Sequence, residues 1–258
     1  MELPWIALSF LAVIGLERTR WRRLPARFLR PHFAADLTFF ATGVVALGLT
    51  MRSAAAALGA QLGFAPLAAW PPVAALALAL LVYDLGAWLA HRAMHHFAFL
   101  WEAHKVHHAS PHLDWLAAFR MHPLEHAIRH AISPVLMLLA GFPAAHVAVA
   151  SILAGGWAAF VHGNLQVGSR ALEWLLVTPR LHHLHHIPES CEQNFGAIFS
   201  VWDRLARRLT TAPAARDAKL GVPGEEHSHP HGWWAQVRTP FVRAERTLSP
   251  QPQSQRAA

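Results

Sequence analysis

The sequence predicts an all-α protein: a multi-pass transmembrane helical bundle with a cytoplasmic helical catalytic lobe that carries a histidine-ligated di-metal site. Three observations support this fold class. Apolar residues make up 54% of the chain and charged residues only 14%, against about a quarter charged in a typical soluble domain. Long apolar runs alternate with polar segments, and three histidine clusters recur at helical spacing. The shortage of charge indicates contact with lipid.

The first apolar run, Leu3–Leu16, is expected to form the first membrane helix. It has no basic region before it and no small-residue cleavage site, so we do not interpret it as a cleaved signal peptide. A charged cluster follows, in which all residues but one are arginines: Glu17, Arg18, Arg20, Arg22, Arg23, Arg27 and Arg30. By the positive-inside rule, this cluster predicts a cytoplasmic location for the segment.

Two further apolar runs are expected before the first histidine cluster. Residues 36–58 have the length of one membrane crossing, about twenty residues. Residues 59–72 are rich in glycine and proline and predict a connection, because counting them as a crossing would separate the histidines from the arginine cluster. Residues 73–90 form the next expected span, which runs directly into His91.

Asp84 is a candidate functional residue inside that span. It lies seven residues before His91, which is two helical turns, and therefore shares its face. A carboxylate within a membrane segment is costly and usually functional. We expect it to accept the free N–H of a metal-ligating imidazole; the alternative is a polar residue at a helix end.

The second half of the chain is expected to continue the same alternation. Residues 91–121 are polar and should lie at the membrane surface. Residues 124–140 and 144–161 predict an in-and-out helical hairpin, which returns His162 to the face of the other histidines. Residues 165–211 carry the third histidine cluster, where Thr178 and the following proline predict a helix start.

The histidine clusters read HRAMHH at 91–96, HKVHH at 104–108 and HHLHH at 182–186. Residues three or four apart share a helix face, so each cluster presents at least two imidazoles together. A single histidine in an apolar region is usually a satisfied core residue, but three clusters offer at least eight imidazoles. That number exceeds the demand of one zinc ion and suits two metals of higher coordination number. Cys191 is the only cysteine, so thiolate ligation is minor.

The chain resembles the fatty acid hydroxylase and sterol desaturase superfamily of integral-membrane di-iron oxidases. The resemblance covers residues 84–205 and rests on the motifs HRAMHH, HKVHH, FRMHPLE (119–125), FVHGN (160–164), TPRLHHLHH (178–186), NFG and WDRL. After WDRL the family usually continues with phenylalanine, glycine and threonine, whereas this chain has Ala206, Arg207 and Arg208. This departure affects the end of the catalytic lobe and none of the expected ligands.

The resemblance implies two iron ions held by the following histidines: His91, His95, His104, His107, His108, His162, His182, His185 and His186. His96 is a further candidate that replaces or joins His95, since some relatives space the first pair by one residue more. His183 is expected beside the ligands. Possible supporting residues are Asp84, Asn164 and Asn194, with Asp203 as a further candidate or a fastening of the lobe. His122 is expected to line the substrate path or support a ligand, and His126 and His130 are interpreted as mostly structural.

The resemblance also implies the chemistry. The expected enzyme uses O2 and two electrons to hydroxylate or desaturate a lipid C–H bond in a sterol, fatty acyl or related lipid. No haem, flavin or dinucleotide motif is evident, so a separate ferredoxin, rubredoxin or cytochrome-type protein is expected to supply electrons. The apolar runs argue against nucleic-acid binding. Composition suggests a bacterial inner membrane with the catalytic side cytoplasmic.

This interpretation divides the chain into residues 1–90, with membrane helices and connections, the catalytic region 84–211, and a flexible tail, 212–258. Two alternatives use the same histidines. A membrane zinc hydrolase also uses helical histidine pairs but needs a glutamate base beside its ligands, and only Glu102 lies near. A metal transporter would hold histidines near mid-membrane rather than at helix ends.

Overall fold

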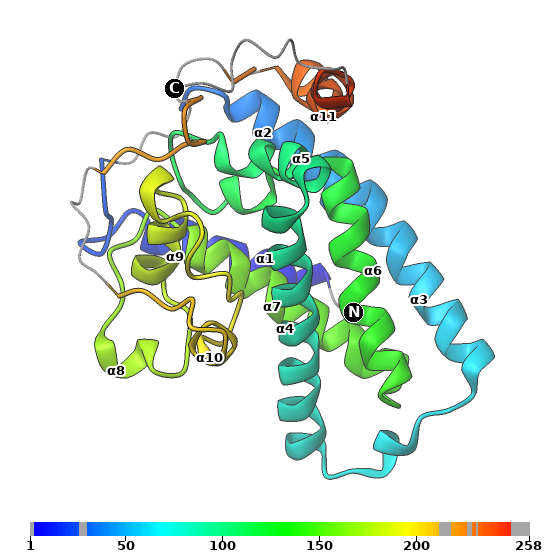
Figure 1. Cartoon of the computed structure of the whole chain (residues 1–258). Coiled ribbons are helices and arrows are strands. Elements are labelled where there is room, and N and C mark those ends of the chain that lie inside the picture. Colours follow the sequence, from blue (N-terminus) through cyan, green and yellow to red (C-terminus); the bar gives the residue numbers. More distant parts are fainter. Residues whose placement is uncertain (1–2, 26–29, 212–217, 226–228, 231, 249–258) are drawn as a thin grey trace.

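The computed structural model describes residues 3–25, 30–211, 218–225, 229–230 and 232–248. These residues form eleven α-helices, one π-helical segment and three short 3-10 helices (Figure 1). Within this described part of the chain, β-structure is limited to two isolated bridges, Arg22–Leu165 and Leu176–Phe199. The prediction of an all-α fold is therefore confirmed for the described residues. Helix α1 comprises Leu3–Leu16.

The second expected apolar run forms one continuous helical rod. Helix α2 (Phe33–Phe40) passes through a π-helical segment (η1, Ala41–Leu47) into α3 (Gly48–Leu62). The π segment leaves Gly43 against the ring of His126, where an added Cβ would lie only 2.0 Å from Nε2. The glycine- and proline-rich segment after α3 contains only a short turn, η2 (Pro66–Ala69), and is a connection, as predicted.

Helices α4 (Pro72–His96), α6 (Pro123–Leu139) and α7 (Ala144–His162) form the centre of the bundle. Helix α6 packs between α4 and α3, and α7 packs against α4 (Figure 1). Close approach of α4 to α6 depends on Gly86, because a Cβ there would lie 2.8 Å from the Cα of Ser133. The closely packed helices present their histidine-bearing ends together.

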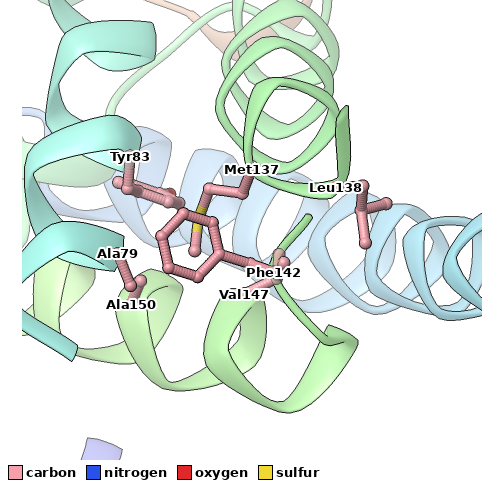
Figure 2. Close-up of a cluster of buried hydrophobic side chains, with 7 residues drawn as sticks. All are labelled: Ala79, Tyr83, Met137, Leu138, Phe142, Val147 and Ala150. Carbon is pink, nitrogen blue, oxygen red and sulfur yellow. The ribbon is translucent and has the colours of Figure 1, made fainter. Parts of the chain in front are cut away.

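A buried apolar cluster joins these three helices away from the histidines. Figure 2 shows how the side chains of Ala79 and Tyr83 from α4 meet those contributed by α6, α7 and their connection: Met137, Leu138, Phe142, Val147 and Ala150. The connection turns sharply at Gly141, whose φ of 90° favours glycine. This hairpin returns His162, the last residue of α7, to the histidine-bearing end, as predicted.

Among the residues that the structure describes, two helices, α4 and α7, are long and apolar enough to cross a membrane, with mean hydropathies of 2.0 and 1.7. Helix α4 ends in the first histidine cluster, and α7 ends at His162. The crossings expected for the other apolar runs stay predictions.

The polar lobe lies beside the upper part of α4 (Figure 1). It contains α5 (Ala98–His108), η3 (Ala117–Phe119), α8 (Arg170–Glu173), α9 (Pro179–His185), η4 (Pro188–Ser190) and α10 (Val201–Leu205). Two buried carboxylates attach it to α4. Asp84 accepts the indole N–H of Trp202 at 2.9 Å, and Asp203 accepts that of Trp88 at 2.9 Å. The lobe is thereby held at a defined height along α4.

Helix α11 (Trp233–Leu248) differs from the flexible tail expected over 212–258. It packs against α5 and α2, whereas residues 212–217, 226–228, 231 and 249–258 lie outside the described part. The helix was not evident in the sequence because its buried positions include polar residues. Gln236 and Thr239 are buried, while Trp234 and Phe241 are exposed, so the apolar residues alone do not mark the face by which the helix docks.

Candidate metal centre

Nine of the ten predicted metal-binding histidines come together in two adjacent groups. The first contains five imidazoles, from His91, His95, His104, His108 and His185, and the second contains four, from His107, His162, His182 and His186. Within each group the candidate ligand atoms lie within 4.8 Å of one another. All belong to buried positions. We call them the five-histidine group and the four-histidine group.

A break between α4 and α5 brings the first two clusters together. Phe97 adopts an extended conformation (φ −92°, ψ 120°), which ends α4 and lets α5 turn back across it. The Nε2 atoms of His91 and His104 consequently lie 3.1 Å apart. His96 lies beyond this convergence, exposed, with its ring against that of Phe97.

Neighbouring histidines on α5 and α9 are divided between the groups. His107 and His108 have ring planes 90° apart, and only His108 joins the five-histidine group. On α9, His185 joins that group while His182 faces the other. Thr178 caps this helix by accepting the N–H of Leu181 at 3.3 Å, which confirms the predicted helix start.

The outward ring nitrogens hold the imidazoles in orientation. In the five-histidine group, Nδ1 of His91 donates to the Phe195 carbonyl at 2.8 Å, and Nδ1 of His185 donates to the Gln193 carbonyl at 2.8 Å. In the four-histidine group the acceptors are the carbonyls of Arg120 for His107 (3.2 Å) and of Ala158 for His162 (2.8 Å). A proton held on Nδ1 leaves the Nε2 lone pair free for a metal.

Two carboxylates also hold ligands, both in the five-histidine group. Glu125, fully buried near the start of α6, accepts Nδ1–H of His104 at 2.8 Å. Glu192 accepts that of His95 at 3.2 Å. Neither role was predicted from the sequence. Glu125 had a recognisable signal, because it is an acidic residue at the start of an apolar helix and the last residue of the quoted FRMHPLE motif.

The Nε2 atoms that face one another inside each group lie at distances suited to binding a metal ion. In the four-histidine group, Nε2 of His162 lies 3.0 Å from that of His107 and 2.9 Å from that of His182. Where Nδ1 carries the ring proton, facing Nε2 atoms cannot hydrogen-bond to each other, so their convergence is costly without a cation. Two nitrogens bound about 2.1 Å from one ion at right angles would lie about 3.0 Å apart. The donor set therefore fits a metal in each group.

Burial also favours the protonation state that binds metals. It lowers the pKa well below the ordinary value of imidazole for these residues of the lobe: His107, His108, His182, His185 and His186. These side chains are therefore neutral at pH 7, as metal ligation requires.

Asp84 does not perform the role expected from its helix face. Its oxygens accept the backbone N–H groups of Ile198 (2.7 Å) and Phe199 (3.0 Å) as well as the Trp202 indole. His91 instead donates to the Phe195 carbonyl. The periodicity placed Asp84 correctly beneath His91, but the lobe supplies closer donors, so the expected hydrogen bond to an imidazole is wrong.

The other predicted supporting residues also bond to the backbone. The Asn164 side chain exchanges hydrogen bonds with Leu24 at 3.0 and 2.8 Å. Asn194, with φ of 59°, donates to the carbonyls of Leu181 and Thr210. It thereby supports the segment 192–195, which contacts three histidines of the five-histidine group.

The other histidines discussed from the sequence lie outside both groups. His183 is buried beside α7. His122 caps α6 by accepting the Leu124 N–H at 3.0 Å and donates to the Val237 carbonyl of α11 at 2.9 Å. His126 and His130 stack with ring centroids 5.6 Å apart. Asp203 accepts the N–H groups of Phe195 and Gly196, and so holds the carbonyl that binds His91.

Comparisons with known proteins agree with this site. The sequence model of a family described as fatty acid hydroxylase matches residues 76–207. The chain is 27% identical over 180 residues to an ornithine lipid hydroxylase of Rhizobium tropici, which covers 67% of this chain and 52% of that protein. It is 30% identical over 159 residues to an alkylglycerol monooxygenase of Danio rerio, covering 60% of this chain and 33% of the relative.

A second alkylglycerol monooxygenase, from Caenorhabditis elegans, is 27% identical over 126 residues, with 47% of this chain and 24% of that protein covered. The chain thus spans about half the length, or less, of these curated relatives. No solved structure gave a significant match. The matched family region contains all nine convergent histidines.

Proposed function

This chain belongs to the fatty acid hydroxylase family, and on that premise we propose that it is a membrane-bound oxygenase that hydroxylates a lipid. In this reaction one lipid C–H bond becomes C–OH; O2, two electrons and two protons are consumed, and the second oxygen atom leaves as water. The observation that carries the proposal is the convergence of nine buried imidazoles in two adjacent groups.

We propose two iron ions as the cofactor, one in each histidine group. Imidazole suits several transition metals, so ligand type alone does not select iron. Facing Nε2 atoms lie 2.9 to 3.2 Å apart. This is close to the separation of two ligands at right angles around one ion, which favours a higher coordination number than that of tetrahedral zinc. When bound, the irons would supply the O2 chemistry that amino-acid side chains lack.

The protein's own residues orient the ligands and exclude water. Carbonyls and carboxylates on the outward nitrogens fix the rings of six of the nine histidines before a metal binds: His91, His95, His104, His107, His162 and His185. Around the five-histidine group, the rings of Trp101 and Phe195 lie 4.7 and 5.0 Å from that of His95. Such an apolar cover limits the quenching of a reactive oxidant by water.

The two alternative functions receive less support. A zinc hydrolase needs a carboxylate base facing the metal, but Glu125 and Glu192 each hold the outer nitrogen of an imidazole, and Glu102 pairs with Lys105. A transporter would place its histidines midway along the spanning helices. Here they occupy the last turns of α4 and the end of α7.

The substrate class is a membrane lipid. Relatives named for ornithine lipid and alkylglycerol support this choice. They favour hydroxylation over desaturation, although both reactions begin by breaking a C–H bond. A sterol or another fatty acyl lipid is an alternative substrate of the same class.

We further propose that a separate electron carrier, such as a ferredoxin, rubredoxin or cytochrome, reduces the centre. The chain has a formal net charge of +7, which suits an acidic carrier because complementary charge accelerates docking. The proposed location is a bacterial inner membrane, with the catalytic lobe on the cytoplasmic side.

The test combines metal analysis with isotope labelling. The full chain would be purified with bound metal and compared with its His108→Ala and His96→Ala variants. We expect two irons in the parent and in H96A, because His96 lies outside both groups, and a loss of iron in H108A. Cells supplied with ¹⁸O2 should form a lipid carrying one labelled oxygen with the parent and H96A only.

Other results would change the proposal in specific ways. A lipid lighter by two hydrogens would indicate desaturation. Zinc in place of iron, with an unlabelled hydrolysis product, would support the hydrolase. Retention of both irons and of the labelled product by H108A would contradict the proposed ligand set.

A further inference from the structure

The polar lobe, which is the catalytic lobe of the proposed enzyme, carries an exposed apolar surface at α8 and α10. Four large side chains form it: Leu172 is 49% exposed, Trp174 68%, Leu175 56% and Leu205 72%. We call it the α8–α10 patch. Isolated exposed apolar residues are normal, whereas several large ones gathered on one surface are typical of a contact with a protein or a membrane.

Contacts between the two segments make the patch one surface. Arg204 of α10 donates to the Trp174 carbonyl at 3.0 Å, and its guanidinium lies over the Trp174 ring, 4.8 Å from the centroid. The Leu175 carbonyl accepts the N–H of Ser200 at 3.0 Å. These contacts hold α10, which carries Leu205, beside residues 172–175, although the two segments are distant in sequence.

The height of the patch follows from its attachment to α4. The lobe is bonded to α4 at Asp84 and Trp88, through Trp202 and Asp203. Only about 18 Å of helix, at about 1.5 Å per residue, separates Pro72 from Asp84. A hydrocarbon layer is about 30 Å thick, so a bilayer crossed by α4 from Pro72 reaches beyond Asp84.

The exposed apolar residues of α4 support the same height. Val73, Ala77, Leu81 and Leu89 are all exposed, and because each step of four residues adds only about 40° of rotation, they form a stripe that winds slowly around the helix. This apolar stripe continues past Trp88, the residue bonded to α10. Figure 1 shows α8 and α10 as the parts of the lobe nearest the Pro72 end of α4. The patch and the end of the stripe therefore lie at similar depths.

The chemistry of the patch is typical of a membrane boundary. Tryptophan prefers the interface, where its ring is partly buried and its N–H reaches water. Arginine covers apolar surface with its stem and keeps its charge near the headgroups. Arg204 lies over Trp174, and Arg170 is exposed at the start of α8. Leucines flanked by arginine and tryptophan suit a lipid surface.

We propose that the α8–α10 patch inserts into the interfacial layer of the membrane and seats the catalytic lobe on the lipid. This inference rests on the membrane setting of the proposed function and adds a second point of contact beside the spanning helices. It holds the histidine groups at the bilayer surface, so a lipid reaches them without passing through water. An acidic electron carrier is the rival occupant, but four large apolar side chains favour lipid.

Site-specific fluorescence tests the proposal. Single cysteines would be introduced at Leu175 and Leu205 in a Cys191→Ser background and labelled with nitrobenzoxadiazole. The full chain would be reconstituted into vesicles of phosphatidylcholine and phosphatidylglycerol. Matched controls are Val73→Cys, on the exposed stripe of α4, and Glu189→Cys, at an exposed acidic position on η4.

Insertion of about 5–10 Å should let a lipid with a nitroxide near its headgroup quench about half of the emission at Leu175 and Leu205, whereas iodide in the water should not. The label at position 189 should be quenched by iodide and not by the nitroxide lipid.

Equal iodide quenching at Leu205 and Glu189 would overturn the proposal. Protection of the patch labels only on addition of a reduced ferredoxin would also reject it, in favour of carrier docking. Failure of the chain to incorporate, with the Val73 label also quenched by iodide, would instead refute the membrane setting of the proposed function.

Discussion

At the scale of single residues, the partner of the outer imidazole nitrogen distinguishes the two histidine groups. Both carboxylate partners, Glu125 and Glu192, belong to the five-histidine group. The hydrogen bonds found for the four-histidine group are to the Arg120 and Ala158 carbonyls. A carboxylate raises the basicity of the imidazole that it holds. The two metal positions should therefore differ in affinity.

Glu125→Gln should selectively weaken metal binding by the five-histidine group. The amide retains an acceptor for His104 but loses the charge, so we expect a loss of about 10–100-fold in metal affinity. Chelator competition followed by metal analysis measures the change. Glu102→Gln is the matched control, because Glu102 pairs with Lys105 on the same lobe. Equal retention of metal by E125Q and E102Q would contradict the role of Glu125.

Glu17 should make stability depend on pH. It is buried, accepts the N–H groups of Trp115 and Asn164, and has its pKa raised by burial to about 7. Because the folded pKa exceeds the unfolded value, its contribution is fully present below about pH 4.5 and is lost as pH rises through 7. The difference amounts to about 3 kcal/mol at most.

Glu17→Gln removes this ionisation while keeping an acceptor for the two N–H groups. The variant should therefore gain stability relative to the parent as pH rises from 5 to 8. Denaturant unfolding in detergent at several pH values provides the comparison. Parallel pH profiles for the parent and E17Q would show that Glu17 does not titrate as described.

At the scale of elements, the segment 192–196 connects α10 to the five-histidine group. Asp203 accepts the N–H groups of Phe195 and Gly196 and the Trp88 indole, while the Phe195 carbonyl holds His91. A carboxylate on a five-residue helix thus positions a ligand on a different helix. The sequence predicted Asp203 only as a candidate supporting residue, because the residues that it connects, such as Trp88, lie more than one hundred positions away in the chain.

Asp203→Ala should lower stability and metal retention together. Losing hydrogen bonds to a buried carboxylate should cost about 3 kcal/mol or more, and freeing the 195 carbonyl should loosen His91. Thermal unfolding and metal content measure the two effects. Trp88→Phe is the control, since it removes only the hydrogen bond between Trp88 and Asp203, leaves that between Trp202 and Asp84, and should retain both metals. Normal metal content in D203A would exclude this positioning role.

At the scale of the whole molecule, Arg120 joins the two ends of the chain to the metal centre. Its guanidinium is fully buried and donates to Asp36 of α2 (2.9 Å), to Gln236 of α11 (3.0 Å) and to the Val106 carbonyl of α5 (3.0 Å). Its own carbonyl accepts from His107. Docking of α11 is therefore coupled to the four-histidine group through one residue.

Arg120→Ala should be among the most destabilising substitutions in the lobe. It leaves Asp36 buried with Arg30 as its one remaining charged partner in the described part of the chain, and breaking a buried ion pair costs about 3–5 kcal/mol. Gln236→Ala removes one neutral partner and should cost about 1 kcal/mol. Thermal unfolding should rank the parent above Q236A and Q236A above R120A; an R120A midpoint equal to that of Q236A would contradict the network.

Apart from α11, the long helices and the candidate ligands were predictable because their signals are local. Apolar runs, a threonine-proline helix start and histidines three or four residues apart all follow from the geometry of one helix. The hairpin that returns His162 could also be predicted, since a glycine and proline turn separates two apolar runs.

Only the tertiary structure decided which histidines share a group and what holds them. His107 and His108 are neighbours in sequence yet belong to different groups, and His96 is excluded because α4 ends just after it. The roles of Glu125, Glu192 and the Phe195 carbonyl, the true partners of Asp84, and the docking of α11 all depend on segments far apart in the chain. Helical spacing determines which imidazoles point together; long-range packing determines what they meet.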